Sequence, residues 1–136
     1  MEKQPRISTD RLILRPFEIA DARDVQHLAG DYAVSRTTLI PYPYPDGLAG
    51  IWIASIQRGI ERGEVAAFAI TLARSGRLIG SIRLQIDRMN ARGELGFWIG
   101  RPFWGQGYAT EAVRAVIGYG FSDLGLNRIY GMHFAR

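Results

Sequence analysis

The chain has 136 residues, 47% of them hydrophobic and 22% charged, which excludes global disorder and suits one domain with its own core. The absence of cysteine excludes disulfides, thiol nucleophiles and cysteine metal sites, and two histidines argue against a histidine-rich metal centre. The net charge of +4 is spread along the chain without any run of five basic residues, which argues against nucleic-acid binding.

Hydrophobic periodicity predicts a strand and then a helix near the N-terminus. Residues 11–16 alternate so that Leu12 and Leu14 share one face of a short strand. Asp21 is expected to cap a helix over residues 22–29, which ends at the glycine that follows. The predicted element order therefore begins with a strand followed by a helix.

The next stretch, residues 31–47, is expected to be an ordered loop. Three prolines within residues 41–45 forbid a regular helix there. Tyr42 and Tyr44 make this loop either a plain surface connection with exposed aromatics or one wall of a substrate pocket, since long irregular loops are often functional.

A second amphipathic helix is predicted after this loop. Asp46 is expected to cap it, and Gly63 is expected to end it just after Arg62. The three-to-four spacing of its apolar residues predicts one buried side. That side is expected to contain Leu48, Ile51, Trp52, Ser55, Ile56, Gly59 and Ile60.

Three strands with period-two patterning follow and predict an antiparallel meander. They cover residues 65–73, 77–87 and 93–100, with a tight turn at 74–77 and another around 89–91. One face of the first two strands is expected to hold Ala66, Phe68, Ile70 and Leu72 together with Leu78, Gly80, Ile82, Leu84 and Ile86.

The last predicted elements are a helix over residues 109–124 and a strand over 128–134. Gly118 and Gly120 inside this helix would each cost about 1 kcal/mol relative to alanine, and close packing against the sheet would explain both. The buried side of the helix is expected to contain Val113, Val116, Ile117, Phe121 and Leu124.

The turn before this helix carries the strongest chemical signal, because Gly105 and Gly107 stand directly before the first helical turn. Helix N-termini present free N–H groups and a partial positive charge, and glycine lets a phosphate approach them closely. The turn therefore suits a pyrophosphate, although a plain glycine-rich turn would show the same spacing. It is neither a P-loop, since it contains no lysine, nor a Rossmann fingerprint, since the preceding strands are predicted to be antiparallel.

Residues 104–112, Trp-Gly-Gln-Gly-Tyr-Ala-Thr-Glu-Ala, resemble the acyl-CoA pyrophosphate loop of the GNAT N-acetyltransferase superfamily, which runs Gln/Arg-x-x-Gly-x-Gly/Ala. Gly107 and Ala109 match its last two fixed positions. Trp104 replaces the first, as is typical of the branch of RimJ/RimL-like ribosomal-protein N-acetyltransferases. The segments that also resemble this branch are 9–16, 43–44 with 52–53, 94–99 and 127–130.

This resemblance covers essentially the whole chain and implies a single GNAT domain over residues 1–136. The implied fold is α+β, with a central, largely antiparallel twisted sheet, helices on both faces, and a splay between the fourth and fifth strands. Family members usually continue for several tens of residues, so the resemblance implies that the last strands and a Ser or Tyr general acid are missing. An open last strand would favour a homodimer.

The resemblance also implies acetyl-CoA as co-substrate and no metal ion. The pantetheine arm is expected to pair with the backbone of Phe97, Trp98 and Ile99 like an extra strand. Arg101 is expected either to help neutralise the phosphates or to lie in solvent. The pyrophosphate is expected at the loop formed by Trp104, Gly105, Gln106, Gly107, Tyr108, Ala109 and Thr110.

The implied reaction is direct transfer of an acetyl group to an amine, which must lose a proton to attack. Glu94 is the candidate general base, because it lies on the strand that lines the cleft, in step with Gly96 and Trp98. A structural pairing of Glu94 with an arginine is the alternative, and His133 is the rival base. The backbone N–H of Trp98 is the candidate that meets the oxyanion, and Glu111 is interpreted as structural.

The acceptor stays open among a protein N-terminus, an amino acid and a small amine, with the loop around Tyr42 and Tyr44 expected to shape its pocket. One alternative function is a non-catalytic acyl-CoA-binding or degenerate domain. Another is an arginine-rich nucleic-acid binder, which would need a clustered basic stripe. Because the sequence shows neither a signal peptide nor an apolar run of about 18 residues, we expect a cytoplasmic protein that binds no membrane.

Overall fold

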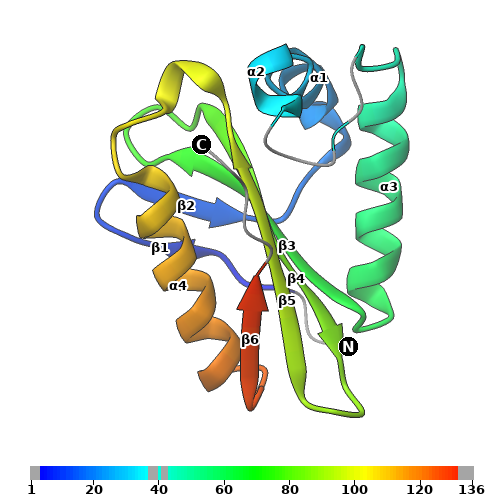
Figure 1. The fold of residues 1–136 in the computed structure, drawn as a ribbon, viewed down its shortest axis with the longest axis vertical. Helices are drawn as coiled ribbons and strands as arrows, with labels where there is room; N and C mark the ends of the chain where they lie inside the picture. The colour runs from blue at the N-terminus through cyan, green and yellow to red at the C-terminus, as the bar shows by residue number, and fades with distance from the viewer. Residues whose placement is uncertain (1–3, 37–39, 41–42, 132–136) are drawn as a thin grey trace.

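The computed structural model describes residues 4–36, 40 and 43–131, within which six strands form one sheet in chain order (Figure 1). The strands are β1 (Ile7–Ser8), β2 (Leu12–Arg15), β3 (Val65–Leu72), β4 (Leu78–Asp87), β5 (Arg92–Ile99) and β6 (Arg128–Gly131). The helices are α1 (Ala22–Ala29), α2 (Tyr32–Ser35), α3 (Leu48–Glu61) and α4 (Tyr108–Ser122), with the 3-10 helices η1 (Ile19–Asp21) and η2 (Arg101–Phe103). The expected α+β class is confirmed.

The sheet is antiparallel from β1 to β5, whereas β5 and β6 run parallel. The predicted meander of three strands corresponds to β3, β4 and β5, and the predicted first strand to β2. β3 lies inside the sheet, and every residue from Val65 to Thr71 is buried. β1 was not predicted, because two residues are too few to show a period.

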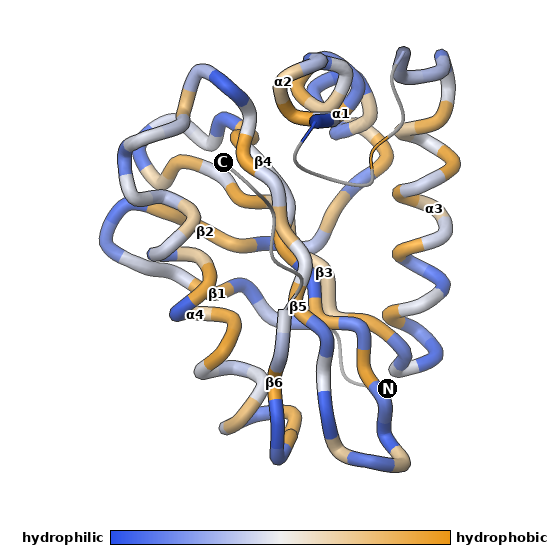
Figure 2. Tube along the Cα trace, in the orientation of Figure 1, coloured by the Kyte–Doolittle hydropathy of each residue, from blue (hydrophilic) through white to orange (hydrophobic). Residues whose placement is uncertain are grey.

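Helices cover both faces of the sheet (Figure 1). On one face, Ala112 and Val116 of α4 pack in the main core cluster around Phe68. On the other face, Val25 of α1 and Ile53 of α3 belong to a second cluster. Figure 2 shows hydrophobic and hydrophilic residues alternating along α3 and α4, as expected for helices with one buried side.

The described pairing between β5 and β6 covers only the first half of β5. Their pairing runs from Arg92 opposite Arg128 to Leu95 opposite Gly131, and β5 then continues to Ile99 without a β6 partner among the described residues. These are the fourth and fifth predicted strands, between which the family resemblance implies a splay. The part of β5 without a described β6 partner leads directly into the glycine-bearing turn. The backbone expected to bind pantetheine and the turn expected to bind the pyrophosphate therefore lie at the same end of β5.

The two aspartates predicted as helix caps make other contacts. Asp21 stands before α1 but makes no capping bond to it. Instead its carboxylate pairs with Arg15 at 2.8 Å and accepts a hydrogen bond from the backbone N–H of Glu18, the N-cap residue of η1. Asp46 accepts a hydrogen bond from Gln26 Nε2 at 2.8 Å and leaves the cap position of α3 to the glycine that follows. In both cases a side-chain donor from another element occupies the carboxylate, which local sequence could not reveal.

A β-bulge changes one predicted face. Ile70 pairs with Gly80 and Thr71 pairs with Leu78, so Ile79 is an extra residue in β4. Because an extra residue reverses the alternation beyond it, Ile79 packs in the α4 cluster and Leu78 packs in the opposite cluster, contrary to the prediction.

The helices bury partly different residues from those predicted. In α3, Ile51 is 67% exposed and Ile53 is fully buried, because a run of consecutive apolar residues leaves the rotation of the helix uncertain by one residue. In α4, Phe121 is 45% exposed rather than buried. The stretch 31–47 is not all loop, since α2 begins directly after Asp31.

Of the two glycines inside α4, only one has a packing reason. A Cβ built at Gly120 would lie 2.6 Å from Ile129 Cδ1, so the helix needs glycine to approach the sheet there. Around Gly118 no atom lies within 4 Å of such a Cβ, and the predicted packing explanation is wrong for this residue.

Some predicted features lie outside the described residues, namely Tyr42, His133 and the end of the strand over 128–134. Among the helices that the structure describes, none is long and apolar enough to cross a membrane.

Candidate active site

The glycine-bearing turn leaves β5 and folds back over the end of this strand. The indole Nε1 of Trp104 donates a 2.6 Å hydrogen bond to the carbonyl oxygen of Ile99, the last residue of β5. The backbone N–H of Trp104 donates to the carbonyl of Arg101 at 3.2 Å. Trp104 therefore ties the beginning of the turn to the strand.

Two glycines in the turn have a left-handed backbone. The φ angle is 75° at Gly105 and 81° at Gly107, which is the N-cap residue of α4. No atom lies within 4 Å of a Cβ built at Gly105, so the backbone conformation, and not lack of space, requires glycine. Left-handed residues in such turns direct successive N–H groups toward one side and create an anion-binding concavity.

A run of backbone N–H groups in this turn has no acceptor among the residues that the structure describes. In the part of the chain that the structure describes, the N–H groups of residues 105–110 donate no hydrogen bond, whereas that of Glu111 donates to the carbonyl of Gly107 at 3.1 Å. Six unsatisfied N–H groups at a helix N-terminus attract an anion. All six belong to residues predicted to bind the pyrophosphate.

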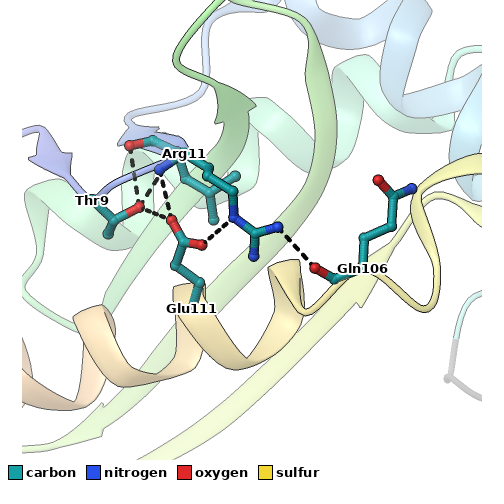
Figure 3. Close-up of polar contacts among 5 residues, drawn as sticks. Thr9, Arg11, Gln106 and Glu111 are labelled. Carbon is teal, nitrogen blue, oxygen red and sulfur yellow. Dashed lines mark hydrogen bonds and ion pairs between the residues drawn. The ribbon is translucent and has the colours of Figure 1, made fainter.

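A cluster of side chains joins this turn to the β1–β2 segment (Figure 3). Arg11 Nη1 donates to the carbonyl oxygen of Gln106 at 2.9 Å, and Arg11 Nε donates to Glu111 Oε1 at 2.7 Å. The same guanidinium lies 4.4 Å from the centre of the Tyr108 ring. The Thr9 hydroxyl and the Arg11 backbone N–H both donate to Glu111 Oε2, at 2.5 and 2.9 Å.

These contacts determine the charge of Glu111. Burial by itself raises the pKa of this carboxyl, but the hydrogen bonds from Thr9 and Arg11 outweigh burial and hold the pKa below its ordinary value. Sequence reasoning did not connect Thr9 and Arg11 with the turn, since about one hundred residues separate them from Glu111. The only signal was the resemblance of segment 9–16 to the family.

The surface beside this cluster is hollowed into a depression of about 560 Å³. It extends from the N-terminal turn of α4 to the β1–β2 segment. The lining residues are Thr9, Asp10, Arg11, Gly107, Thr110, Glu111, Arg114 and Ala115.

The backbone of β5 alternates between β4 and the open edge. The N–H of Gly100 donates to a carbonyl of β4 at 2.7 Å, whereas the carbonyl of Ile99 accepts from Trp104 on the other side. Because backbone groups alternate sides along a strand, Phe97 and Ile99 present theirs at the open edge and Trp98 presents its own to β4. Of the three residues predicted to pair with pantetheine, Trp98 is therefore the one whose backbone groups face β4. Its N–H cannot reach an oxyanion at the other edge of β5, and only its side chain is available to a ligand there.

Glu94 lies on the face of β5 that it shares with Gly96 and Trp98, as the alternation predicts. Its side chain is half-buried, and its cross-strand neighbours are Gln85 on β4 and Tyr130 on β6. Among the described residues, no arginine or other cation pairs with its carboxylate. The structure therefore offers no support for a structural ion pair of Glu94 within this part of the chain.

Arg83 lies on the same face as Glu94. It stands opposite Gly96 in the register, and its Nε lies 3.5 Å from a Cβ built at this glycine. Arg83 is exposed and has no ion pair within the described ranges. A carboxylate and a guanidinium that are not joined to each other thus flank the small residue on this part of β5.

Arg101 is the other charged side chain that was considered for the phosphates. Arg101, which was expected either at the phosphates or in solvent, is exposed and lies 4.0 Å from a carboxylate oxygen of Asp31.

Within the residues that the structure describes, no group of three or more His, Asp, Glu or Cys side chains could hold a metal ion.

Known acetyltransferases match this chain in sequence. Residues 11–136 match the family model described as the acetyltransferase (GNAT) domain. The chain is 37% identical over 123 residues to the uncharacterized N-acetyltransferase p20 of Bacillus licheniformis, and this alignment covers 89% of the chain and 68% of p20.

Solved structures match the fold. A crystal structure of a probable acetyltransferase agrees with a TM-score of 0.80 at 25% identity, covering 93% of this chain and 73% of that one. The ribosomal L7/L12 alpha-N-protein acetyltransferase RimL, solved in complex with coenzyme A, agrees with a TM-score of 0.78 at 16% identity, covering 92% of this chain and 72% of RimL. At this identity the RimL likeness shows the fold alone.

Proposed function

The chain belongs to the GNAT acetyltransferase family, and on that premise we propose that it transfers an acetyl group from acetyl-CoA directly to a primary amine. The observation that carries this proposal is the run of six backbone N–H groups before and in the first turn of α4 that have no acceptor among the described residues, next to the part of β5 that has no β6 partner among them. Such a run suits a pyrophosphate, and an open strand edge suits an extended arm that carries amide groups. A CoA thioester has both features.

In this proposal the pantetheine arm pairs with the N–H and C=O groups of Phe97 and with the N–H of Ile99, which face the edge of β5 away from β4. The carbonyl of Ile99 already accepts from Trp104. Trp98 contributes its side chain only. Trp104 holds the turn against the end of β5 through its bond to Ile99. The N–H groups that bind the pyrophosphate belong to Gly105, Gln106, Gly107, Tyr108, Ala109 and Thr110.

Glu94 acts as the general base, directly or through a water molecule. It accepts a proton from the amine while the amine nitrogen forms a bond to the thioester carbonyl carbon. The carbonyl oxygen gains negative charge, and a backbone N–H at the open edge, from Phe97 or Ile99, stabilises it in place of Trp98. The C–S bond then breaks, and CoA leaves as a thiolate that takes up a proton. Support for Glu94 comes from its half-buried carboxylate, which pairs with no cation among the described residues. His133 stays the rival base.

The acceptor is proposed only as a primary amine of a protein N-terminus, an amino acid or a small molecule. We place the enzyme in the cytoplasm and include no nucleic-acid partner. The homodimer expected from the sequence stays a prediction, which sedimentation at high protein concentration tests: a strictly monomeric profile would contradict it.

Calorimetric titration of the purified chain with acetyl-CoA tests the cofactor site. We expect saturable binding, and we expect Gly107→Asp to weaken it by more than about 100-fold, because a carboxylate placed among the N–H groups repels phosphate and a side chain strains a left-handed residue. Dephospho-CoA and ATP serve as controls for the donor. No binding by a folded chain would refute the proposal and favour a degenerate domain.

Glu94→Gln tests the base, once a screen of peptides, amino acids and polyamines has identified an acceptor. We expect turnover to fall by about 10²- to 10⁴-fold, because glutamine cannot accept the proton. The Kd for acetyl-CoA should not change, since Glu94 lies outside the pyrophosphate turn. Unchanged turnover would exclude Glu94 and leave His133 as the candidate.

A further inference from the structure

We propose that Arg11 is a positioning residue of the acetyl-CoA site, which holds the Gln106–Gly107 peptide so that the N–H of Gly107 faces the pyrophosphate. This inference rests on the proposed function and adds to it a residue from the opposite end of the chain. Arg11 lies 95 residues before Gln106, and the fold brings its guanidinium to the carbonyl oxygen at 2.9 Å (Figure 3).

The geometry of one peptide unit links Arg11 to the N–H of Gly107. The carbonyl of Gln106 and the N–H of Gly107 belong to the same trans peptide, so they point in opposite directions. By accepting from Arg11, the carbonyl is directed toward the β1–β2 segment, and the N–H of Gly107 is directed away from it. Rotation of this peptide by half a turn would present a carbonyl oxygen to the phosphate, and two negative groups repel each other.

The turn by itself does not prevent such a rotation. Gly105 lies directly before Gln106 and Gly107 directly after it, and glycine reaches alternative backbone conformations at little steric cost. Its internal side-chain bonds involve Trp104 and a 3.5 Å contact from Gln106 Nε2 to Pro102, and neither holds the carbonyl of Gln106. Among the described residues, Arg11 is the one side chain from outside the turn and α4 that bonds to a carbonyl of the turn.

The other contacts of Arg11 hold the guanidinium itself in place. Nε donates to Glu111 Oε1 at 2.7 Å, and the centre of the Tyr108 ring lies 4.4 Å from the guanidinium carbon. A planar group with several donors can make these contacts together, whereas the single ammonium of lysine cannot.

Arg11 also has a second, separable effect on the site. Glu111 is ionised and lines the same depression as Gly107, so without Arg11 its charge would repel an incoming phosphate. Removing Arg11 therefore loses both the orientation of the peptide and the neutralisation of Glu111. A double variant that also removes the carboxylate charge separates the two effects.

The experiment measures the Kd of acetyl-CoA by calorimetry for the wild-type chain, Arg11→Ala, Arg11→Lys and Arg11→Ala/Glu111→Gln. The control is Arg62→Ala, which removes a surface arginine at the end of α3, on the opposite face of the sheet from α4. We expect Arg11→Ala to weaken binding about 10- to 100-fold, as for loss of a charge-assisted hydrogen bond, and the double variant to stay weak. Arg11→Lys should recover part of the affinity, and the control should bind like wild type.

Two results would overturn the proposal. One is equal affinity of Arg11→Ala and Arg62→Ala; the other is full recovery in the double variant, which would assign the whole effect to charge. Thermal unfolding is recorded for each variant. If Arg11→Ala is unfolded at the assay temperature, Arg11→Lys takes its place in the test, and wild-type affinity of Arg11→Lys would then refute the positioning role. Failure of the folded wild-type chain to bind acetyl-CoA would instead refute the proposed function.

A kinetic measurement excludes a merely structural role. S-acetylpantetheine lacks the pyrophosphate, so we expect the Arg11 variants and the wild-type chain to use it as donor equally well, while the KM for acetyl-CoA rises in the variants. A structural defect would impair both donors alike, and that outcome would contradict the proposal.

Discussion

Two arginines at the ends of β2 each pair with one carboxylate. Arg11, just before β2, pairs with Glu111, and Arg15, the last residue of β2, pairs with Asp21. The closest distances are nearly equal, 2.7 Å for the first pair and 2.8 Å for the second. The surroundings differ, because the side chains are 45% and 18% exposed in the Arg11 pair but 16% and 9% exposed in the Arg15 pair.

The partners of the two pairs differ as well. The Arg15 pair is local: Arg15 also donates to the carbonyl of Pro16, and Asp21 also accepts from the backbone N–H of Glu18. It fixes the path of the chain from β2 into α1. The Arg11 pair instead joins residues 100 positions apart and contacts the turn proposed to bind pyrophosphate. The same two chemical groups thus join neighbouring segments where they are buried, and join the β1–β2 segment to the proposed cofactor site where they are half-exposed and distant in sequence.

The largest effect in this comparison is expected from Arg15→Ala. It would leave the buried carboxylate of Asp21 without its cation, which costs about 3 kcal/mol of the free energy of unfolding and lowers the Tm by roughly 10 °C. Thermal and urea unfolding measure this loss. The Kd for acetyl-CoA, measured below the transition, should stay that of the wild type. A loss of affinity as large as that of Arg11→Ala would remove the distinction between the two pairs.

A smaller effect, dependent on pH, is expected from Asp21→Asn. Burial raises the pKa of Asp21, but the hydrogen bonds from Arg15 and from the Glu18 backbone outweigh it and hold the pKa below the ordinary value of 3.8. A lowered folded pKa means that the stabilisation is complete above pH 3.8 and is lost as the pH falls through the folded pKa. We expect the variant to lose about 2 kcal/mol at pH 7 and to approach the wild type below pH 4.

Urea unfolding at several pH values between 7 and 3 checks this expectation, with Glu111→Gln as the matched comparison. The pKa of Glu111 is also lowered, so its pH dependence has the same sign, but its half-exposed partner makes the expected change smaller. A difference between Asp21→Asn and wild type that does not vary with pH would show that the charge of Asp21 contributes nothing.

The smallest effect is expected from Thr9→Val, which removes the hydroxyl donor to Glu111 and keeps the shape of the side chain. One neutral donor to a carboxylate contributes about 1 kcal/mol, and the Arg11 contacts remain. We expect the Kd for acetyl-CoA to rise less than about threefold in the same calorimetric titration. A loss equal to that of Arg11→Ala would mean that the hydroxyl, and not the guanidinium, positions the turn.

Much of the architecture could be predicted from local pattern. Period-two alternation located β3, β4 and β5 to within one or two residues, and the positions of Gly105 and Gly107 located the turn before α4. These features depend on residues within a few positions of one another. The same holds for Gly63, which ends α3 with a positive φ as predicted.

Other features were missed for reasons that can be stated physically. The bulge at Ile79 depends on how β4 pairs with β3, which a single strand does not encode. Asp46 bonds to Gln26 and not to the helix that it precedes, because the competing donor lies on another element. For the candidate site, the orientation of the Trp98 backbone toward β4 follows from pairing, and no local pattern distinguishes it from Phe97.

The sequence by itself determined most of the strands and helices, β1 and α2 excepted, that no disulfide is possible, and that a glycine-bearing turn presents N–H groups at the start of α4. The tertiary structure alone decided which groups of β5 face the open edge, that Glu94 has no cation paired with it among the described residues, and that Arg11 reaches Gln106 and Glu111. Secondary structure follows from steric and hydrophobic preferences over a few residues, whereas these contacts depend on strand pairing and on distances between groups about one hundred residues apart.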